Sequence, residues 1–146
     1  TNDFRLAGYD GNMSRTLDSC VEELNEISIE KLNKYVDLFK NSMKQAHYLF
    51  GGYAFRKVTP NYNSMRKSTI NKSLMLAVSV LLAAHREYCK LTTRKNLTDE
   101  LAILLQNDRQ LNDAISWSTS TKKSILYVFD CLKNNLFDKF LLNNNE

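Results

Sequence analysis

The run Leu74-Met-Leu-Ala-Val-Ser-Val-Leu-Leu-Ala-Ala84 decides the fold class of this chain. Every residue in it except Ser79 is apolar, so no stripe of polar positions marks a side that faces solvent. Such a segment is typical of a helix buried on all sides or of a buried strand, and its length favours the helix. Because Asn71 can cap its start, we predict a buried central helix at about residues 71–89.

Two amphipathic helices are predicted ahead of this segment. Asn12 can cap a helix that ends near residue 26 and has apolar residues every three or four positions. Ser28 can cap a second helix, which keeps that spacing for about six turns until Gly51 and Gly52. Glycine readily adopts the left-handed conformation in which many helices end, so the second helix should stop there. Both helices are expected to lay one apolar stripe against the central helix.

The rest of the chain is predicted to form a long loop and three more helices. Residues 53–69 break the helical pattern around Pro60 and are predicted to be the loop. The three further helices are predicted at about 96–106, 108–117 and 121–142. A hydroxyl-rich run from Ser116 to Thr121 separates the last two. We therefore expect an all-α fold in which residues 1–146 form a single compact domain of five to six helices around the central one.

The overall composition agrees with one helical core. The 146 residues are 43% hydrophobic and include one Pro and four Gly, which leaves few of the turn residues that many short strands require. The net charge of +4 hides an uneven distribution. Residues 18–37 have six carboxylates against two lysines, whereas no Asp or Glu occurs from Leu38 to Arg86. One side of the domain is therefore expected to be negative and another positive.

Cysteine usage and hydropathy predict a cytoplasmic protein. The three cysteines, Cys20, Cys89 and Cys131, are an odd number without Cys-x-x-Cys spacing, which favours buried thiols in a reducing compartment over disulfides or zinc. No apolar run approaches the roughly 20 residues of a membrane helix, so we expect neither a membrane span nor a signal peptide. Because the sequence opens without Met and enters in mid-pattern, we expect it to be part of a longer protein.

No catalytic, metal-binding or cofactor-binding residues are predicted. His47 and His85 belong to no zinc motif and are interpreted as structural residues. Gly-rich phosphate loops, nucleophile elbows and His-Glu-x-x-His are missing from the sequence. Carboxylate pairs such as Glu22 and Glu26 lie one helical turn apart, where solvation on an exposed face explains them. This chain by itself is therefore not expected to be an enzyme.

A basic loop is the best candidate for a binding site. The candidate residues are Arg56, Lys57, Arg66, Lys67, Lys72, Lys122 and Lys123 for phosphate contact, and Tyr53 and Tyr62 for stacking on bases. Cations beside aromatic rings are common on nucleic-acid-binding surfaces, because the cations neutralise phosphates and the rings stack on bases. The alternative is that the aromatic rings fill the core under the loop and the cations are solvated or pair with the acidic first half. Both interpretations stay open at the level of sequence.

Short stretches along nearly the whole chain together resemble one bacterial family. They are Phe4-Arg5, Asn12-Met13, Leu49–Lys57, Ile70–Leu74, Ser79-Val80 and Asp113–Thr119. In this order and spacing they resemble the C-terminal helical part of the domain of unknown function 262 family, which is related to the GmrS half of GmrSD restriction systems. The chain departs from the family pattern at Leu76, where an acidic residue is common, and at Tyr127 and Val128, near which an arginine is common.

The resemblance implies a role in bacterial defence. Proteins of this family carry, ahead of this region, a ParB-like domain with an Asp-Gly-Gln-Gln-Arg signature that is associated with nucleotide hydrolysis and nuclease function. This chain would then be the non-catalytic accessory module, with that missing N-terminal domain and DNA as its partners. The alternative is a protein–protein scaffold or oligomerisation module without nucleic-acid binding, in which the acidic first half of one copy pairs with the basic middle of another.

Overall fold

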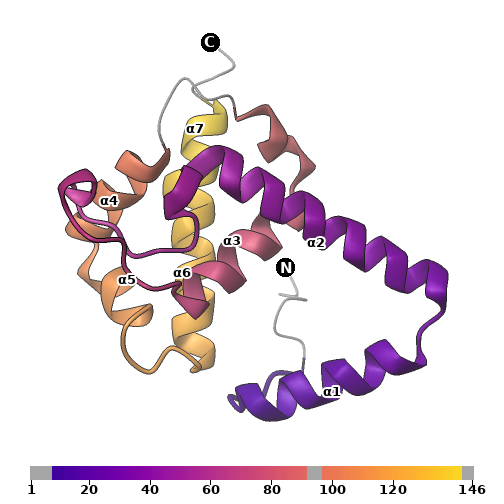
Figure 1. Cartoon of the computed structure of the whole chain (residues 1–146). Coiled ribbons are helices and arrows are strands. Elements are labelled where there is room, and N and C mark those ends of the chain that lie inside the picture. The colour runs from indigo at the N-terminus through magenta and orange to yellow at the C-terminus, as the bar shows by residue number, and fades with distance from the viewer. Residues whose placement is uncertain (1–7, 92–96, 143–146) are drawn as a thin grey trace.

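A computed structural model describes residues 8–91 and 97–142 and shows a set of α-helices joined by turns (Figure 1). The α-helices are α1 (Met13–Glu26), α2 (Ile29–Phe50), α3 (Lys72–Ala84), α4 (Leu97–Asn107), α5 (Arg109–Ala114), α6 (Lys122–Leu132) and α7 (Asp138–Leu142). The described residues contain no strand, and one isolated bridge joins Arg56 to Ile70. The prediction of an all-α fold is confirmed.

The apolar run that decides the fold class forms α3 at the centre of the core. The Asn71 side chain caps this helix, because its oxygen accepts a hydrogen bond from the Leu74 backbone N–H at 3.0 Å. Helix α3 packs against α2 on one side and against α6 on another. The buried side chains of α3 are Leu74, Ala77, Val78, Leu81 and Leu82. The central helix is confirmed, although its α-helical part ends at Ala84 and a 3-10 helix, η4 (Arg86–Lys90), continues it.

The C-terminal helices complete the core beside α3. The C-terminal helices form one continuous rod, since a π-helical turn, η5 (Lys133–Phe137), joins α6 to α7. In this turn the Asp138 backbone N–H donates to the Lys133 carbonyl, and the extra residue places both Leu136 and Phe137 in the core. The Phe137 ring stacks on Tyr88 at a centroid distance of 5.0 Å and meets Phe50 edge-on at 6.2 Å.

Helix α1 and the first half of α2 depart from the prediction. Both were expected to lay an apolar stripe on the central helix, but α1 has no buried residue. The buried residues of α2 begin only at Ser42. Figure 1 shows α1 apart from the other helices, joined to the far end of α2 by a short turn. Met13, at the start of α1, packs against the core, and Leu17 lines a cavity shared with α3 and α6. Most of the rest of the apolar stripe on α1 and on the first half of α2 is exposed.

The exposure of α1 also corrects the prediction of three buried thiols. Cys131 is buried on α6, whereas Cys20 and Cys89 are exposed. Cys20 is exposed because it lies on α1, where no residue is fully buried. The predicted start of a helix at Asn96 and the tail at 143–145 lie outside the described residues. Within the described part of the chain, no helix has both the length and the apolar character needed to cross a membrane.

Candidate nucleic-acid interface

The basic loop between α2 and α3 has a fixed path. Helix α2 ends at Phe50, and Gly51 caps it with a φ of 56° and a ψ of −139°. This positive φ suits glycine, but the ψ differs from the left-handed helical conformation that was predicted. Phe55 also has a positive φ, of 63°, which is uncommon for a residue with a side chain. Its carbonyl accepts a hydrogen bond from the Asn71 backbone N–H at 2.8 Å, and the Ser68 hydroxyl donates to the Lys57 carbonyl at 2.8 Å. These two bonds tie the beginning of the loop to its end.

Asn71 connects this loop to a second one. In addition to capping α3, its side-chain amide donates to the Ile115 carbonyl at 2.8 Å. The loop that follows α5 is thereby held beside the basic loop. Lys57 reinforces the connection, because its Nζ donates to the Ser116 hydroxyl at 2.7 Å.

The basic loop, together with Leu105 of α4 and Asn112 of α5, lines a cavity of about 310 Å³, which we name the basic cavity. Its lining residues are Tyr53, Lys57, Val58, Thr59, Tyr62, Met65, Arg66, Lys67, Ser68, Leu105 and Asn112. Three predicted phosphate contacts, Lys57, Arg66 and Lys67, thus share one cavity. None of the described lining residues carries a carboxylate, while hydroxyl and amide groups supply additional donors. Such a lining favours an anionic ligand.

The cations of the basic cavity have no carboxylate partner within the described part of the chain. Lys67 Nζ lies 4.9 Å from the centre of the Tyr53 ring, a cation–π distance. Arg66 and Lys67 are exposed, whereas Lys57 is half-buried. The positive charge is therefore fixed in place at Lys57 and accessible at the other two residues.

The two aromatic residues proposed for stacking have structural roles. Tyr62 is only 6% exposed, and its hydroxyl donates to Asp99 Oδ1 at 2.6 Å, which fastens the loop to α4. The half-buried Tyr53 ring meets Tyr62 at a centroid distance of 4.6 Å and has Lys67 nearby. In this conformation Tyr62 offers no face to a base. Both rings pack under the loop, as the alternative interpretation predicts.

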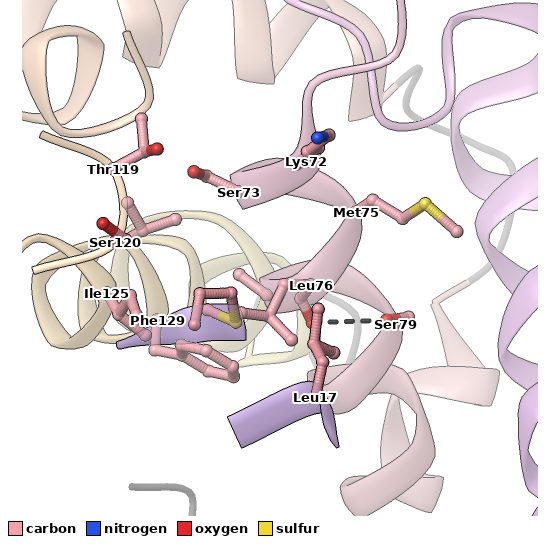
Figure 2. Close-up of a pocket in the computed structure, with 13 residues that line it drawn as sticks. Leu17, Lys72, Ser73, Met75, Leu76, Ser79, Thr119, Ser120, Ile125 and Phe129 are labelled. Atoms are coloured by element: carbon pink, nitrogen blue, oxygen red, sulfur yellow. Dashed lines mark hydrogen bonds between the residues drawn. The ribbon is translucent and has the colours of Figure 1, made fainter. Parts of the chain in front are cut away.

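The remaining candidate cations lie outside the basic cavity. The Arg56 guanidinium donates to the Ser68 carbonyl and so stabilises the loop itself. Lys72 lies at the rim of a different, mostly apolar cavity of about 360 Å³ between α1, α3 and α6 (Figure 2). Lys122 and Lys123 are exposed in the first turn of α6 and line neither cavity. The structure therefore brings together three of the seven cations.

The hydroxyl-rich run before α6 contains a helix cap. Thr121 accepts a hydrogen bond from the Ser124 backbone N–H at 3.2 Å, so its side chain occupies the first turn of α6. The two residues before Thr121, Thr119 and Ser120, line the apolar cavity opposite Ser73 (Figure 2). The hydroxyl-rich run thus supplies the cap of α6 at Thr121.

A polar cluster that the sequence did not reveal joins α5 to α6. Asp108 caps α5 by accepting a hydrogen bond from the Leu111 backbone N–H at 2.8 Å. The same carboxylate accepts hydrogen bonds from the Tyr127 hydroxyl at 2.8 Å and from the Cys131 thiol at 3.3 Å. Asp108 was predicted only as a helix start, and the two partners lie too far along the chain for spacing to indicate the contact.

The charges in this cluster are set by burial and hydrogen bonding. Burial opposes the ionisation of Asp108, but the hydrogen bonds that it accepts outweigh burial, so its pKa lies below the ordinary value. Burial and the neighbouring carboxylate raise the pKa of Tyr127 to about 12. Burial raises the pKa of Cys131 to about 11. At neutral pH the phenol and the thiol therefore stay protonated as donors to an ionised Asp108.

Metal binding finds no support among the described residues, where no three His, Cys, Asp or Glu side chains gather closely enough to hold an ion.

Comparisons of the chain with protein-family models, with curated proteins and with solved structures found no match. The basic cavity, with its three cations and neutral donors, is thus the feature on which a functional proposal can rest.

Proposed function

We propose that this domain is a non-catalytic accessory module of a bacterial restriction-type defence protein and that it binds the phosphate backbone of DNA at the basic cavity. The resemblance to the domain of unknown function 262 family supports the first part of this proposal. The observation that carries the second part is the convergence of Lys57, Arg66 and Lys67 on one cavity without a carboxylate in its described lining. The module would support an N-terminal ParB-like domain, which would contribute the nucleotide hydrolysis or nuclease activity.

The expected mode of binding is electrostatic. Arg66 and Lys67 are exposed and can contact consecutive phosphates, while Lys57, held by Ser116, contributes a fixed charge from within the cavity. Because Tyr62 is buried, base stacking contributes little, and the domain should prefer no particular sequence. Weak, sequence-independent binding that decreases with salt is the expected behaviour.

Charge reversal at the rim of the cavity tests this proposal. Arg66→Glu combined with Lys67→Glu is expected to weaken binding of a labelled DNA duplex by on the order of 100-fold at low salt, because two phosphate contacts become repulsive. Fluorescence anisotropy measures this change. Both residues are exposed, so the far-ultraviolet circular dichroism spectrum and the melting temperature should stay close to those of the parent chain.

The matched control is Arg86→Glu combined with Lys90→Glu on η4. This pair makes the same change in charge at two exposed residues that do not line the basic cavity. Binding is expected to fall much less in the control than at the cavity. Equal losses of affinity in the two variants would show that binding depends only on the net charge of the domain. Unchanged binding after charge reversal at Arg66 and Lys67 would contradict DNA binding at the basic cavity.

A second function, oligomerisation, is favoured by a different observation. The exposed apolar residues of α1 and α2 are not part of the basic cavity, and they offer a surface for protein association.

A further inference from the structure

The apolar cavity between α1, α3 and α6 is separate from the basic cavity, and the two share no described lining residue. Its volume of about 360 Å³ falls within the roughly 300–1,000 Å³ of pockets that hold small molecules. Apolar side chains of three helices form most of its wall, among them Leu17 of α1, Leu76 of α3 and the buried Phe129 of α6. A ligand that fits this wall needs an apolar part.

Polar side chains gather at one end of the apolar cavity. Figure 2 shows the first two residues of α3, Lys72 and Ser73, toward the same end as Thr119 and Ser120 from the loop before α6. The side chain of Phe129 lies toward the other end. The cavity is therefore amphipathic along its length, and a ligand that matches it has a polar head and an apolar tail.

The polar end of the cavity favours a negative charge. Among the described residues that line the cavity, Lys72 is the one with a charged side chain, and no carboxylate accompanies it. The three hydroxyl groups beside it can donate hydrogen bonds to an anion. Lys72 and Ser73 also begin a helix of 13 residues, whose dipole makes this end positive. One cation with hydroxyl donors matches a head group with a single negative charge.

The length of the cavity limits the tail. Along α3 the lining extends from Lys72 to Ser79, which is about 10 Å at the helical rise of 1.5 Å per residue. An extended aliphatic chain advances about 1.3 Å per carbon, because its bonds of about 1.5 Å follow a zigzag. A chain of about eight carbons therefore spans the distance from the polar end to the far end.

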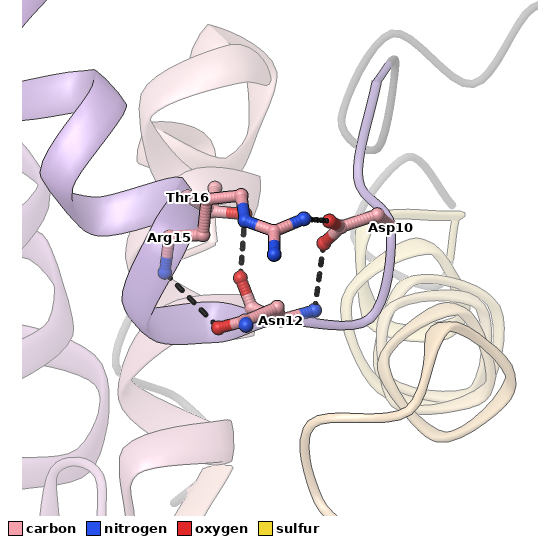
Figure 3. Close-up of polar contacts among 4 residues, drawn as sticks. All are labelled: Asp10, Asn12, Arg15 and Thr16. Atoms are coloured by element: carbon pink, nitrogen blue, oxygen red, sulfur yellow. Dashed lines mark hydrogen bonds and ion pairs between the residues drawn. The ribbon is translucent and has the colours of Figure 1, made fainter.

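Hydrogen bonds before α1 hold the start of this helix beside the polar end of the cavity. The hydroxyl of the buried Tyr9 donates to the carbonyl of Ser120, which itself lines the cavity. Asp10 then accepts hydrogen bonds from the Asn12 backbone N–H at 2.8 Å and from the Arg15 guanidinium at 2.5 Å (Figure 3). These contacts fix the turn that leads α1 over the cavity.

We propose that the apolar cavity binds a medium-chain fatty acid, with the carboxylate at Lys72 and Ser73 and the aliphatic chain between Leu17 and Phe129. Leu17 lines the cavity although it is 57% exposed, so a bound chain covers it and joins α1 to α3 and α6. Since α1 has no fully buried residue, this contact should add substantially to the packing that holds it. The inference goes beyond DNA binding and does not depend on it.

Isothermal titration calorimetry of the 146-residue chain with octanoate and hexanoate tests the apolar part of the site. Each methylene group that becomes buried is expected to strengthen binding about fourfold, so octanoate should bind about 15-fold more tightly than hexanoate. No saturable binding of octanoate, or equal affinities for the two acids, would overturn the proposal.

Lys72→Gln tests the charged end. The variant is expected to bind octanoate about threefold to fivefold more weakly, because an exposed ion pair is lost, and to bind neutral 1-octanol as the parent chain does. Lys123→Gln is the matched control, since Lys123 is also exposed in the first turn of a helix but does not line the cavity. Equal losses of octanoate affinity in the two variants would contradict the placement of the carboxylate at Lys72.

Leu17→Asp tests the position of the aliphatic chain. A carboxylate in the wall opposes both the chain and the anionic head, so octanoate should bind at least about 10-fold more weakly. Val21→Asp is the matched control, because Val21 is one turn further along α1 and also 57% exposed but does not line the cavity. This control should bind octanoate like the parent chain. Equal effects of the two substitutions would overturn the proposal, since octanoate would then bind the exposed apolar face of α1 and not the cavity.

Discussion

Replacement of Phe137 by alanine is expected to lower the free energy of unfolding by about 3–5 kcal/mol. Phe137 is completely buried, and its ring joins three elements of the fold. It stacks on Tyr88 of η4 and meets Phe50 at the end of α2 edge-on. Truncation leaves a cavity where these elements converge, and neither aromatic partner can move into it without losing contacts of its own. This is the largest effect expected for any single substitution considered for this domain.

Urea unfolding followed by circular dichroism measures the effect of Phe137→Ala. The control is Trp117→Ala, which removes a larger aromatic side chain that is 74% exposed and should change stability by less than about 0.5 kcal/mol. Both comparisons should be made at one protein concentration, because any self-association adds to apparent stability. A loss below about 1 kcal/mol for Phe137→Ala would contradict the packing described for the π-helical turn.

The second large effect is expected for Asp108→Ala, at about 2–3 kcal/mol. The substitution removes the cap of α5, which contributes about 1 kcal/mol. It also leaves the Tyr127 hydroxyl and the Cys131 thiol without their acceptor in a partly buried site. Asp113→Ala on the same helix is the matched control. Its carboxylate is exposed and makes only a 3.8 Å surface pair with Arg109, so the loss should stay near zero.

Acid titration separates the charge of Asp108 from its role as a cap. Because the folded state lowers the pKa of this carboxyl, the ionised form contributes stability above the ordinary pKa of about 3.9 and loses it as pH falls toward the folded pKa. The difference in stability between the parent chain and Asp108→Ala should therefore be constant from pH 5 to 7 and shrink below about pH 4. A difference that stays constant at low pH would assign the effect to packing alone.

Helix positions in this chain follow directly from local sequence signals. Asn12, Ser28 and Asn71 were each predicted as caps, and each accepts the expected backbone hydrogen bond. Capping depends on residues three positions apart, so the sequence contains all of the relevant information. The apolar run of α3, broken only by Ser79, likewise predicts a mostly buried helix without reference to any partner, although Leu76 in it is 37% exposed.

The positions of side chains relative to distant elements could not be predicted. The apolar stripe on α1 indicates that this helix packs against another apolar surface. The spacing of the stripe cannot show whether that surface belongs to the same molecule. The π-helical turn shifts the helical phase by one residue, so Phe137 joins Leu136 in the core although a regular period excludes it. Tyr62 is buried and its hydroxyl donates to Asp99 on α4, and a loop without periodicity gives no signal of this contact.

In the basic loop, part of the candidate site could be predicted from the sequence and part could not. Its cations were recognised from composition, and three of them converge on the basic cavity. Arg56 and Lys72 do not join them: Arg56 bonds to its own loop, and Lys72 lies on a different cavity. Which cations converge depends on the path of the loop, and that path is fixed by hydrogen bonds to Asn71 and Ser116 from outside the motif.

The central claim, that the basic cavity binds DNA phosphates, is tested most directly by the salt dependence of binding. Anisotropy titrations of a labelled duplex with the parent chain and with Lys57→Gln/Arg66→Gln/Lys67→Gln, each at several salt concentrations, give the slope of log affinity against log salt. The account predicts a linear decrease for the parent chain and a slope shallower by about 0.9 for each phosphate contact removed from the variant. Identical slopes for the two proteins, or no binding by the parent chain at low salt, would contradict it.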